Sequence, residues 1–292
     1  MSLHPGTRPP TLDRLGTSDL IETFAFLDRD PVLNVYLLAV LLRDALVPSR
    51  DEFWAARRGG GIEALMMLGT GSGSALPVGD DEVALGRLGA HAVERLGALP
   101  RRFQVIGERE AIVPFLSSFA SAGLTPRLRR DQVYMALRHD RLAGIEPLAA
   151  LRPARPEDYA LVYETGARLR AEELEEDPRD IDPAAYARRV EEECREESTF
   201  VWREGDQLRF RASVSARTVD AVQISGVYTP PECRGRGFAT RGVAELCRRL
   251  FPHSRAACLF VNGFNAPALA VYRKLGFESL AAWGSAFFSQ GP

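Results

Sequence analysis

A glycine-rich basic turn in the second half of the chain limits what this sequence can fold into. Residues 227–239 read Val-Tyr-Thr-Pro-Pro-Glu-Cys-Arg-Gly-Arg-Gly-Phe-Ala, with an apolar segment before them and a helical pattern after them. The order predicts a strand that ends at prolines and leads into a helix. Gly235 and Gly237 would let an anion approach the backbone, and free amides at a helix start favour negative charge. The turn is therefore predicted to bind a phosphate group.

Two arginines strengthen this interpretation. Arg234 and Arg236 flank the first glycine and can form charge-assisted hydrogen bonds to phosphate oxygens. The alternative is an ordinary surface turn that uses glycines for geometry and arginines for solvation. Other phosphate loops fit less well, because the turn has neither a Gly-Lys-Ser/Thr ending nor a Gly-x-Gly-x-x-Gly spacing.

The length and composition exclude several classes of protein. A chain of 292 residues has room for two domains, and 46% hydrophobic with 26% charged residues is typical of globular proteins. The longest nearly apolar stretch, residues 32–42, is too short to cross a membrane, so no membrane association is expected. A formal net charge of -2 without a basic domain argues against a nucleic-acid partner.

The cysteines and the N-terminal residues indicate the cellular compartment of the protein. Four cysteines are too sparse and irregular for a disulfide framework, and their spacing predicts no metal site. Residues 1–14 form a proline-rich tail without the features of a signal peptide. We expect a cytoplasmic protein with no bound metal.

The first half alternates helical and strand-like segments. Helices are expected at residues 20–27, with Ile21, Phe24 and Leu27 on one face, and after Asp30 as the cap, with Leu37 facing inward. The remaining expected elements are strands at 62–68, 103–106 and 133–137, a helix at 82–96, and a linker at 139–150.

The second half begins a new domain at residue 151 with a short strand and a Pro-Glu-Asp helix start. An acidic helical region over 172–197, broken at Pro178 and Pro183, comes next. The expected elements after it are strands at 199–203, 208–215 and 221–229, a helix at 237–250, a strand at 257–261, a helix at 268–275 and a strand at 283–288. The predicted fold class is α/β (α+β), with two domains that each have a central mixed sheet flanked by helices.

The anion-binding turn and a second motif together resemble the GNAT superfamily of acyl-coenzyme A N-acyltransferases. Residues 234–239 are similar to its Arg/Gln-x-x-Gly-x-Gly/Ala signature, and residues 265–277 are similar to its Asn-x-x-Ala-x-x-x-Tyr-x-x-x-Gly-Phe segment. The likeness covers about residues 151–288. It implies a catalytic acetyltransferase domain at 149–292, with acetyl-CoA as cofactor.

The resemblance also implies which residues bind the cofactor. The strand end would splay from its neighbour and pair with the pantetheine arm, the amides of the turn would hold the pyrophosphate, and Asn265 would contact the arm or cap the next helix. The cofactor-binding residues implied are Val227, Tyr228, Thr229, Arg234, Gly235, Arg236, Gly237, Phe238, Ala239, Thr240 and Asn265.

Tyr272 is the catalytic residue that the resemblance implies, as the acid that protonates the departing thiolate. Taken alone, it is an aromatic at helical spacing from other core residues. The amine must also lose a proton before it attacks. Candidate bases are Glu164, Glu172, Glu173 and Asp220, and the sequence selects none of them. Cys233 has no neighbouring histidine in sequence and fits a small filler better than a nucleophile.

An internal similarity links the two halves. A shift of 153 places Pro114 on Pro267, Gly123 on Gly276 and Phe119 on Tyr272, but Ile112 on Asn265. The acidic residues 80–82 fall near the basic turn and would repel a pyrophosphate. We interpret residues 1–145 as a degenerate GNAT-like accessory domain that packs on the catalytic half; an unrelated α/β cap is the alternative.

The predicted function is transfer of an acetyl group from acetyl-CoA to a primary amine of a small molecule or peptide by direct attack. The alternative is a non-catalytic sensor of acyl-CoA. The acidic residues 172–177 either border the acceptor cleft and favour a cationic acceptor, or form a solvated helix face. The identity of the acceptor, the acyl chain length and the oligomeric state do not follow from the sequence.

Overall fold

The computed structural model describes residues 9–47 and 51–290, so the first eight residues of the expected proline-rich tail lie outside the described part. The chain divides into two compact units. Unit 1 comprises residues 1–134 and 280–292, and unit 2 comprises residues 135–279. The sequence-based division lies near residue 147 and keeps the C-terminal residues with the second half, whereas the contacts group residues 280–292 with the first.

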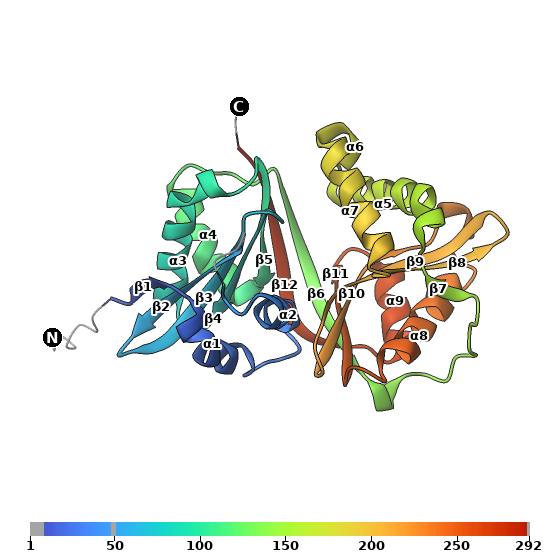
Figure 1. The fold of residues 1–292 in the computed structure, drawn as a ribbon, viewed down its shortest axis with the longest axis horizontal. Coiled ribbons are helices and arrows are strands. Elements are labelled where there is room, and N and C mark those ends of the chain that lie inside the picture. The colour runs from blue at the N-terminus through green and yellow to red at the C-terminus, as the bar shows by residue number, and fades with distance from the viewer. Residues whose placement is uncertain (1–8, 48–50, 291–292) are drawn as a thin grey trace. The chain divides into compact units, whose positions relative to one another are not determined.

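Unit 1 contains a mixed sheet with helices on both faces (Figure 1). Its strands lie in the order β1-β2-β3-β4-β5-β12-β6. The strand bounds are β1 Thr11–Arg14, β2 Asp51–Arg58, β3 Gly61–Gly69, β4 Ser74–Gly79, β5 Arg102–Glu108, β6 Leu128–Arg138 and β12 Glu278–Ser289. The helices are α1 Leu20–Leu27, α2 Val35–Asp44, α3 Glu82–Glu94 and α4 Arg109–Ser121.

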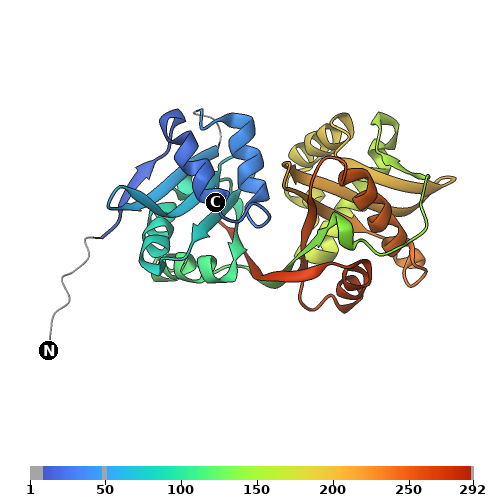
Figure 2. The same cartoon turned by 90° about the horizontal axis from the view of Figure 1, so that it is seen from below.

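Strand β3 shows why this sheet is covered on both sides. Met66 and Leu68 pack in a core with α3 and α4, while the alternate residues Leu65 and Met67 pack in a second core with α1 and α2. Because successive side chains of a strand point to opposite faces, a continuous apolar run buries both. The two helical layers of unit 1 are visible in Figure 2.

Strand β12 connects the end of the chain to unit 1. Residues Trp283–Ser289 pair antiparallel with Glu108–Arg102 of β5, and Ala286 and Phe288 are buried in the core beneath α3 and α4. The stacked rings of Phe288 and Phe103 lie 5.0 Å apart. The core of unit 1 therefore includes residues from the last strand of the sequence.

Unit 2 repeats the arrangement of helices around a mixed sheet. Its strand order is β11-β10-β9-β8-β7, with the end of β6 beside β11. The strand bounds are β7 Leu151–Pro153, β8 Thr199–Glu204, β9 Gln207–Arg217, β10 Ala221–Tyr228 and β11 Ala256–Asn262. The helices are α5 Tyr159–Leu174, α6 Pro178–Ile181, α7 Pro183–Arg195, α8 Phe238–Leu250 and α9 Ala266–Leu275.

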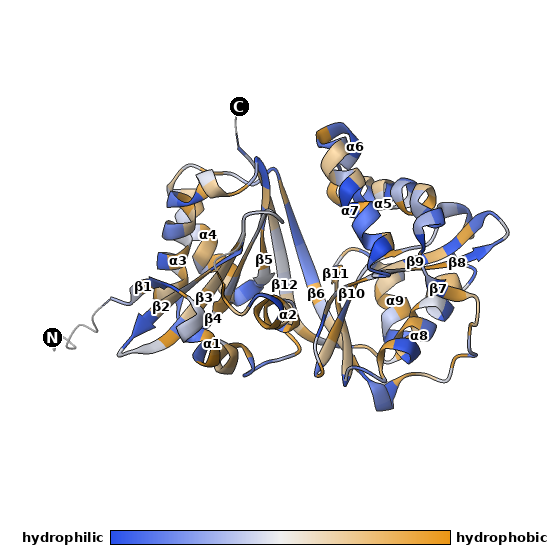
Figure 3. Cartoon of the chain, viewed as in Figure 1, coloured by the Kyte–Doolittle hydropathy of each residue, from blue (hydrophilic) through white to orange (hydrophobic). Residues whose placement is uncertain are grey.

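Helices α5 to α7 cover one face of the unit 2 sheet, and α8 and α9 cover the other (Figure 1). Helix α7 is largely hydrophilic (Figure 3), and it buries only Tyr186, Val190 and Cys194 at intervals of four residues. That interval places the three side chains on one face of the helix. The predicted fold class, with a mixed sheet and flanking helices in each half, is confirmed.

Two local predictions in the first half are wrong. In α1 the buried residues are Thr23, Phe26 and Leu27, whereas Ile21 is 85% exposed and Phe24 is 36% exposed. The second helix starts at Val35 and not directly after Asp30, because the Asp30 carboxylate caps a preceding turn at the amide of Leu33 (3.1 Å).

The four cysteines, Cys194, Cys233, Cys247 and Cys258, are free and buried. Among the described residues, no helix combines the length and the apolar character needed to cross a bilayer. The same residues contain no group of three or more side chains arranged to hold a metal ion.

Candidate active site

The site in unit 2 begins where two parallel strands stop pairing. Strands β10 and β11 pair over residues Ala221–Gln223 and Ala256–Cys258. Strand β10 continues to Tyr228, which pairs with Arg211 of β9 on its other side. No further pairing with β11 occurs within the described range, so the second half of β10 has an open edge with backbone groups available to an extended ligand.

A β-bulge changes the direction of the β10 backbone at this open edge. The pairing of β10 with β9 shifts register between Gln223 and Ile224 and again between Ser225 and Tyr228. Gly226 lies inside the second shift with φ +58°, a backbone conformation that residues other than glycine rarely adopt. Bulges of this kind bend a strand locally, and here the bend precedes the anion-binding turn.

The anion-binding turn, residues 229–237, exposes a row of backbone donors at the start of α8. Gly235 and Gly237 have φ values of +73° and +81°, and a Cβ on either would meet no atom within 4 Å. The first bond of the helix runs from the Arg241 amide to the Gly237 carbonyl (3.1 Å). The amides of residues 235–240 have no acceptor in the described parts of the chain. Free amides at a helix start form an anion site.

The two arginines of the turn differ in their contacts. Arg234 donates from Nη2 to the Glu172 carboxylate (2.7 Å) and from Nε to the Thr229 carbonyl (3.1 Å), so it ties the turn to α5. Arg236 is exposed and has no carboxylate partner among the residues described; its guanidinium lies 5.2 Å from the centre of the Phe238 ring. Arg236 is therefore the free cation of the pair.

Tyr272 is buried in α9 at 5% exposure, and its ring lies 5.6 Å from that of Phe277. Its hydroxyl makes no hydrogen bond to any described residue. Burial raises the pKa of the Tyr272 phenol well above its ordinary value, and the charge of Glu173 adds to the shift. The phenol therefore stays protonated at neutral pH and can act as a proton donor.

Asn265 caps α9, as the sequence suggests. Its Oδ1 accepts a hydrogen bond from the Ala268 amide (3.2 Å). Its side-chain nitrogen has no acceptor among the described residues, so it can still donate to a ligand. The capping and binding roles are thus compatible in one side chain.

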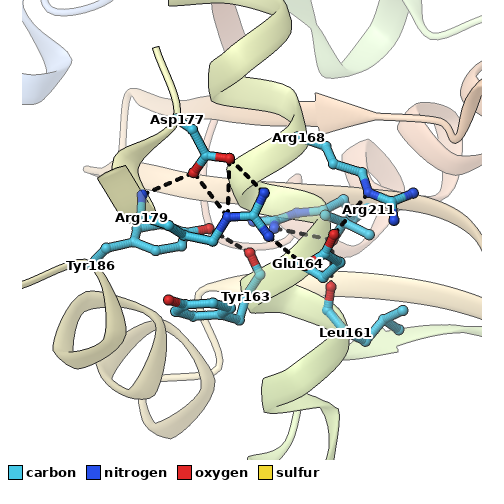
Figure 4. A network of polar contacts seen from close by, with 9 residues as sticks. Leu161, Tyr163, Glu164, Arg168, Asp177, Arg179, Tyr186 and Arg211 are labelled. Carbon is cyan, nitrogen blue, oxygen red and sulfur yellow. Dashed lines mark hydrogen bonds and ion pairs between the residues drawn. The ribbon is translucent and has the colours of Figure 1, made fainter. Parts of the chain in front are cut away.

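The candidate bases Glu164, Glu172 and Asp220 are held in ion pairs. Glu164 accepts from Arg168 (3.1 Å) and from Arg179 (2.7 Å), in a network that ties α5 to α6 (Figure 4). Glu172 pairs with Arg234, and Asp220 pairs with Arg255 (2.8 Å) at the opposite end of β10 from Tyr228. Glu173 is exposed and raises the pKa of Tyr272, which places its charge near the phenol.

Of the acidic residues 172–177, Glu172 joins α5 to the anion-binding turn through Arg234, and Asp177 accepts hydrogen bonds from Arg179 (Figure 4). Cys233 lies buried at the base of the turn, where its Sγ accepts a hydrogen bond from Arg209 Nη1 (3.4 Å). This contact agrees with a packing role for Cys233.

Three buried polar atoms lie at the strand ends, and Asn262 is the residue among them that the sequence did not identify. Tyr228 Oη, Thr229 Oγ1 and Asn262 Oδ1 are buried without a hydrogen-bond partner among the described residues. An unpaired buried polar atom costs free energy, so a ligand at the opening would gain from satisfying it. The sequence signal for Asn262 was its position as a polar residue that ends an apolar strand.

In unit 1, a carboxylate of the chain itself caps the helix start that corresponds to the anion-binding turn of unit 2. Strands β4 and β5 pair only at Ser74 with Gln104 and Ala75 with Val105, so they also diverge. At the start of α3, however, Asp81 Oδ1 accepts from the Ala84 amide (2.7 Å). A carboxylate of the chain thus occupies the place where an external anion would bind.

Comparison with known proteins agrees with this geometry. Residues 167–277 match the model of the Acetyltransferase (GNAT) family. A tandem GNAT protein from the clavulanic acid biosynthesis pathway is 19% identical with a TM-score of 0.54, covering 97% of this chain and 99% of its own. No curated protein matches the sequence.

Two further solved structures cover nearly the whole chain. A GCN5-related N-acetyltransferase from Sphaerobacter thermophilus is 18% identical with a TM-score of 0.57, and the match covers 97% of this chain and 96% of that one. A Drosophila protein is 15% identical with a TM-score of 0.65, and the match covers 95% and 98%. These similarities show that the chain shares the fold of these proteins over nearly its whole length.

Proposed function

We propose that the protein transfers an acetyl group from acetyl-CoA to a primary amine of a small molecule or peptide. The observation that carries this proposal is the row of unpaired amides at residues 235–240, placed directly after the open edge of β10. The unpaired amides suit a diphosphate, and the open strand edge suits an extended arm that carries amide groups.

The proposal includes the following cofactor contacts. Residues Val227, Tyr228 and Thr229 would pair with the pantetheine arm along the open edge. The amides of Gly235, Arg236, Gly237, Phe238 and Ala239, together with the Thr240 hydroxyl, would hold the pyrophosphate. Asn265 would donate its free amide N–H to the arm while it caps α9. Arg234 would hold the turn in place through Glu172.

The reaction that this arrangement supports is direct attack of a neutral amine on the thioester carbonyl. A C–N bond forms, the C–S bond breaks, and Tyr272 gives its phenolic proton to the departing sulfur. The proton of the amine leaves to solvent.

Unit 1 is proposed to be an accessory domain without cofactor chemistry. Its equivalent turn is closed by Asp81, which is also paired with Arg58 (3.0 Å), and Asp80 and Glu82 add negative charge beside it. A pyrophosphate would be repelled by these carboxylates. We therefore expect one cofactor per chain.

Calorimetric titration with coenzyme A tests binding, and a thiol-release assay with acetyl-CoA and a library of primary amines tests turnover. Binding together with amine-dependent thiol release supports the acetyltransferase. Binding without release for any amine in the library favours an acyl-CoA sensor instead. Absence of binding contradicts both functions.

A further inference from the structure

A groove in unit 1 runs along α4, between this helix and strands β6 and β12. Its volume is ≈ 380 Å³, and small-molecule sites in proteins typically measure roughly 300–1,000 Å³. The strands line the groove with residues 129–131 and 284–286. Helix α4 lines it with residues at intervals that place them on one face of the helix, namely Arg109, Ile112, Val113, Leu116, Ser117 and Ala120.

Small residues of β12 make the hollow between the strand and the helix. Gly284 and Ala286 are alternate residues of the strand, so they lie on the same face of the sheet. A Cβ on Gly284 would lie 2.6 Å from Ile112 Cδ1, so only glycine lets the strand approach the helix this closely. Ile112 and Leu116 are buried, and Val113 is 62% exposed. The groove therefore has an apolar floor that reaches solvent.

The rest of the lining carries a surplus of positive charge. It contains Arg109, Arg129 and Arg130, and among the described residues Asp131 is the acid that opposes them. Arg109 pairs with Asp131, which joins the start of α4 to β6. Arg129 lies two positions before Asp131, on the same face of β6. Arg129 is exposed and has no carboxylate partner in the part of the chain that the structure describes, so it is an unpaired cation beside the apolar floor.

We propose that this groove binds an aliphatic carboxylate, with its chain over Ile112, Val113 and Leu116 and its carboxylate at Arg129. The helix rises about 16 Å over residues 109–120, at 1.5 Å per residue, so the lining suits an extended chain better than a compact ring. Apolar chains gain free energy when they leave water, and a guanidinium forms charge-assisted hydrogen bonds with a carboxylate. Unit 1 would then have a ligand of its own, independent of the acetyltransferase function proposed for unit 2.

The test is calorimetric titration of the full chain with octanoate. Acetate supplies the charge without the chain, and 1-octanol supplies the chain without the charge. Ala120→Trp fills the groove, and Ala122→Trp is its matched control, because Ala122 is also exposed but lies outside the lining. Arg129→Gln removes the cation. Its matched control is Arg101→Gln, because Arg101 is an exposed arginine of unit 1 outside the lining, without an ion pair among the described residues. Thermal unfolding checks that each variant keeps the fold.

The wild type and both controls should bind octanoate about tenfold or more tightly than acetate or 1-octanol. Arg129→Gln should bind octanoate no more tightly than 1-octanol, and Ala120→Trp should lose about tenfold in affinity for octanoate. Three results would each overturn the proposal: a wild type that does not prefer octanoate, a preference that persists in Arg129→Gln, or unchanged octanoate affinity in Ala120→Trp. None of them bears on the binding of coenzyme A, which is measured separately.

Discussion

Ser285 donates a hydrogen bond from its hydroxyl to the side-chain oxygen of Gln132 (2.8 Å), and the two residues are 153 positions apart in the chain. That separation equals the shift that aligns the two halves of the sequence. Gln132 lies in β6 and Ser285 lies in β12, the last strand of each half. Residues that correspond by internal similarity therefore bond to each other directly.

The ends of two helices show the same correspondence. The Phe277 amide donates to the Tyr272 carbonyl (3.0 Å) after Gly276, and the Leu124 amide donates to the Phe119 carbonyl (2.9 Å) after Gly123. Both glycines have positive φ, as a helix C-terminus of this kind requires. The halves share this backbone geometry, but only the second has a phenol at the aromatic position.

Replacing Tyr272 with phenylalanine should lower kcat by about 100-fold and leave the affinity for coenzyme A unchanged. The hydroxyl has no hydrogen-bond partner in the described chain, so its removal should not reduce the free energy of unfolding. Tyr186→Phe is the contrasting control, because its hydroxyl donates to the Tyr163 carbonyl (2.7 Å). Full turnover in Tyr272→Phe, measured by thiol release, would exclude the acid role.

Gly237→Val should abolish measurable binding of coenzyme A. The substitution forces a β-branched residue to φ +81° and places side-chain atoms where the phosphate would lie. Gly123→Val is the matched control, because Gly123 has φ +75° and equally open surroundings but lies in unit 1. Each variant should lose about 1–2 kcal/mol of stability, and only Gly237→Val should lose binding. Unchanged affinity in Gly237→Val would move the site elsewhere.

Asp81→Ala should destabilise unit 1 by about 1 kcal/mol without creating a second cofactor site. The carboxylate caps α3 at the Ala84 amide, and Asp80 and Glu82 would keep the turn negative after its removal. Calorimetry should give one molecule of coenzyme A per chain for both the wild type and the variant. A stoichiometry of two in the wild type would contradict the accessory role of unit 1.

Asp158 should make the stability of unit 2 sensitive to acid. Burial alone would raise its pKa, but hydrogen bonds from Arg152, the Arg155 amide and Arg203 outweigh it and lower the pKa from 3.8 to about 2. Through this shift Asp158 contributes about 2 kcal/mol to the free energy of unfolding above pH 4, and this contribution is lost as the pH falls toward 2. In urea unfolding, the stability difference between the wild type and Asp158→Asn should shrink over that interval; a constant difference would contradict this account.

Phe288→Ala should destabilise unit 1 by about 3–5 kcal/mol, although the residue lies near the end of the sequence. Phe288 is 3% exposed and stacks on Phe103. Leu280→Ala, at a position on the same strand that is 48% exposed, should change stability little. Amide exchange should show the loss of protection in β5, the strand that pairs with β12. Unchanged protection in β5 would argue against this pairing.

Segments with a strong period and clear boundaries were predicted well from the sequence. Helix α8 and the breaks of the acidic region at Pro178 and Pro183 lie where the glycines and prolines indicated. Strands β2 and β4 were missed, because β2 is rich in charged residues and β4 is short and contains Pro77. Helix α4 was missed because Pro114 lies inside it.

At the site, local motifs indicated the turn, the Asn265 cap and the position of Tyr272, because each depends on neighbours in the sequence. The partners of these residues depend on tertiary packing. The sequence predicts a phosphate contact for Arg234, but it could not indicate the ion pair of Arg234 with Glu172, which lies 62 positions away.

The pairing of β5 with β12 has a consequence for biosynthesis. Residues 102–108 leave the ribosome long before residues 283–289 exist, so the nascent first unit presents an incomplete sheet whose apolar face lacks Ala286 and Phe288. An exposed strand edge of this kind invites pairing with other chains. Residues 283–289 must therefore be synthesised before that edge of β5 can be covered.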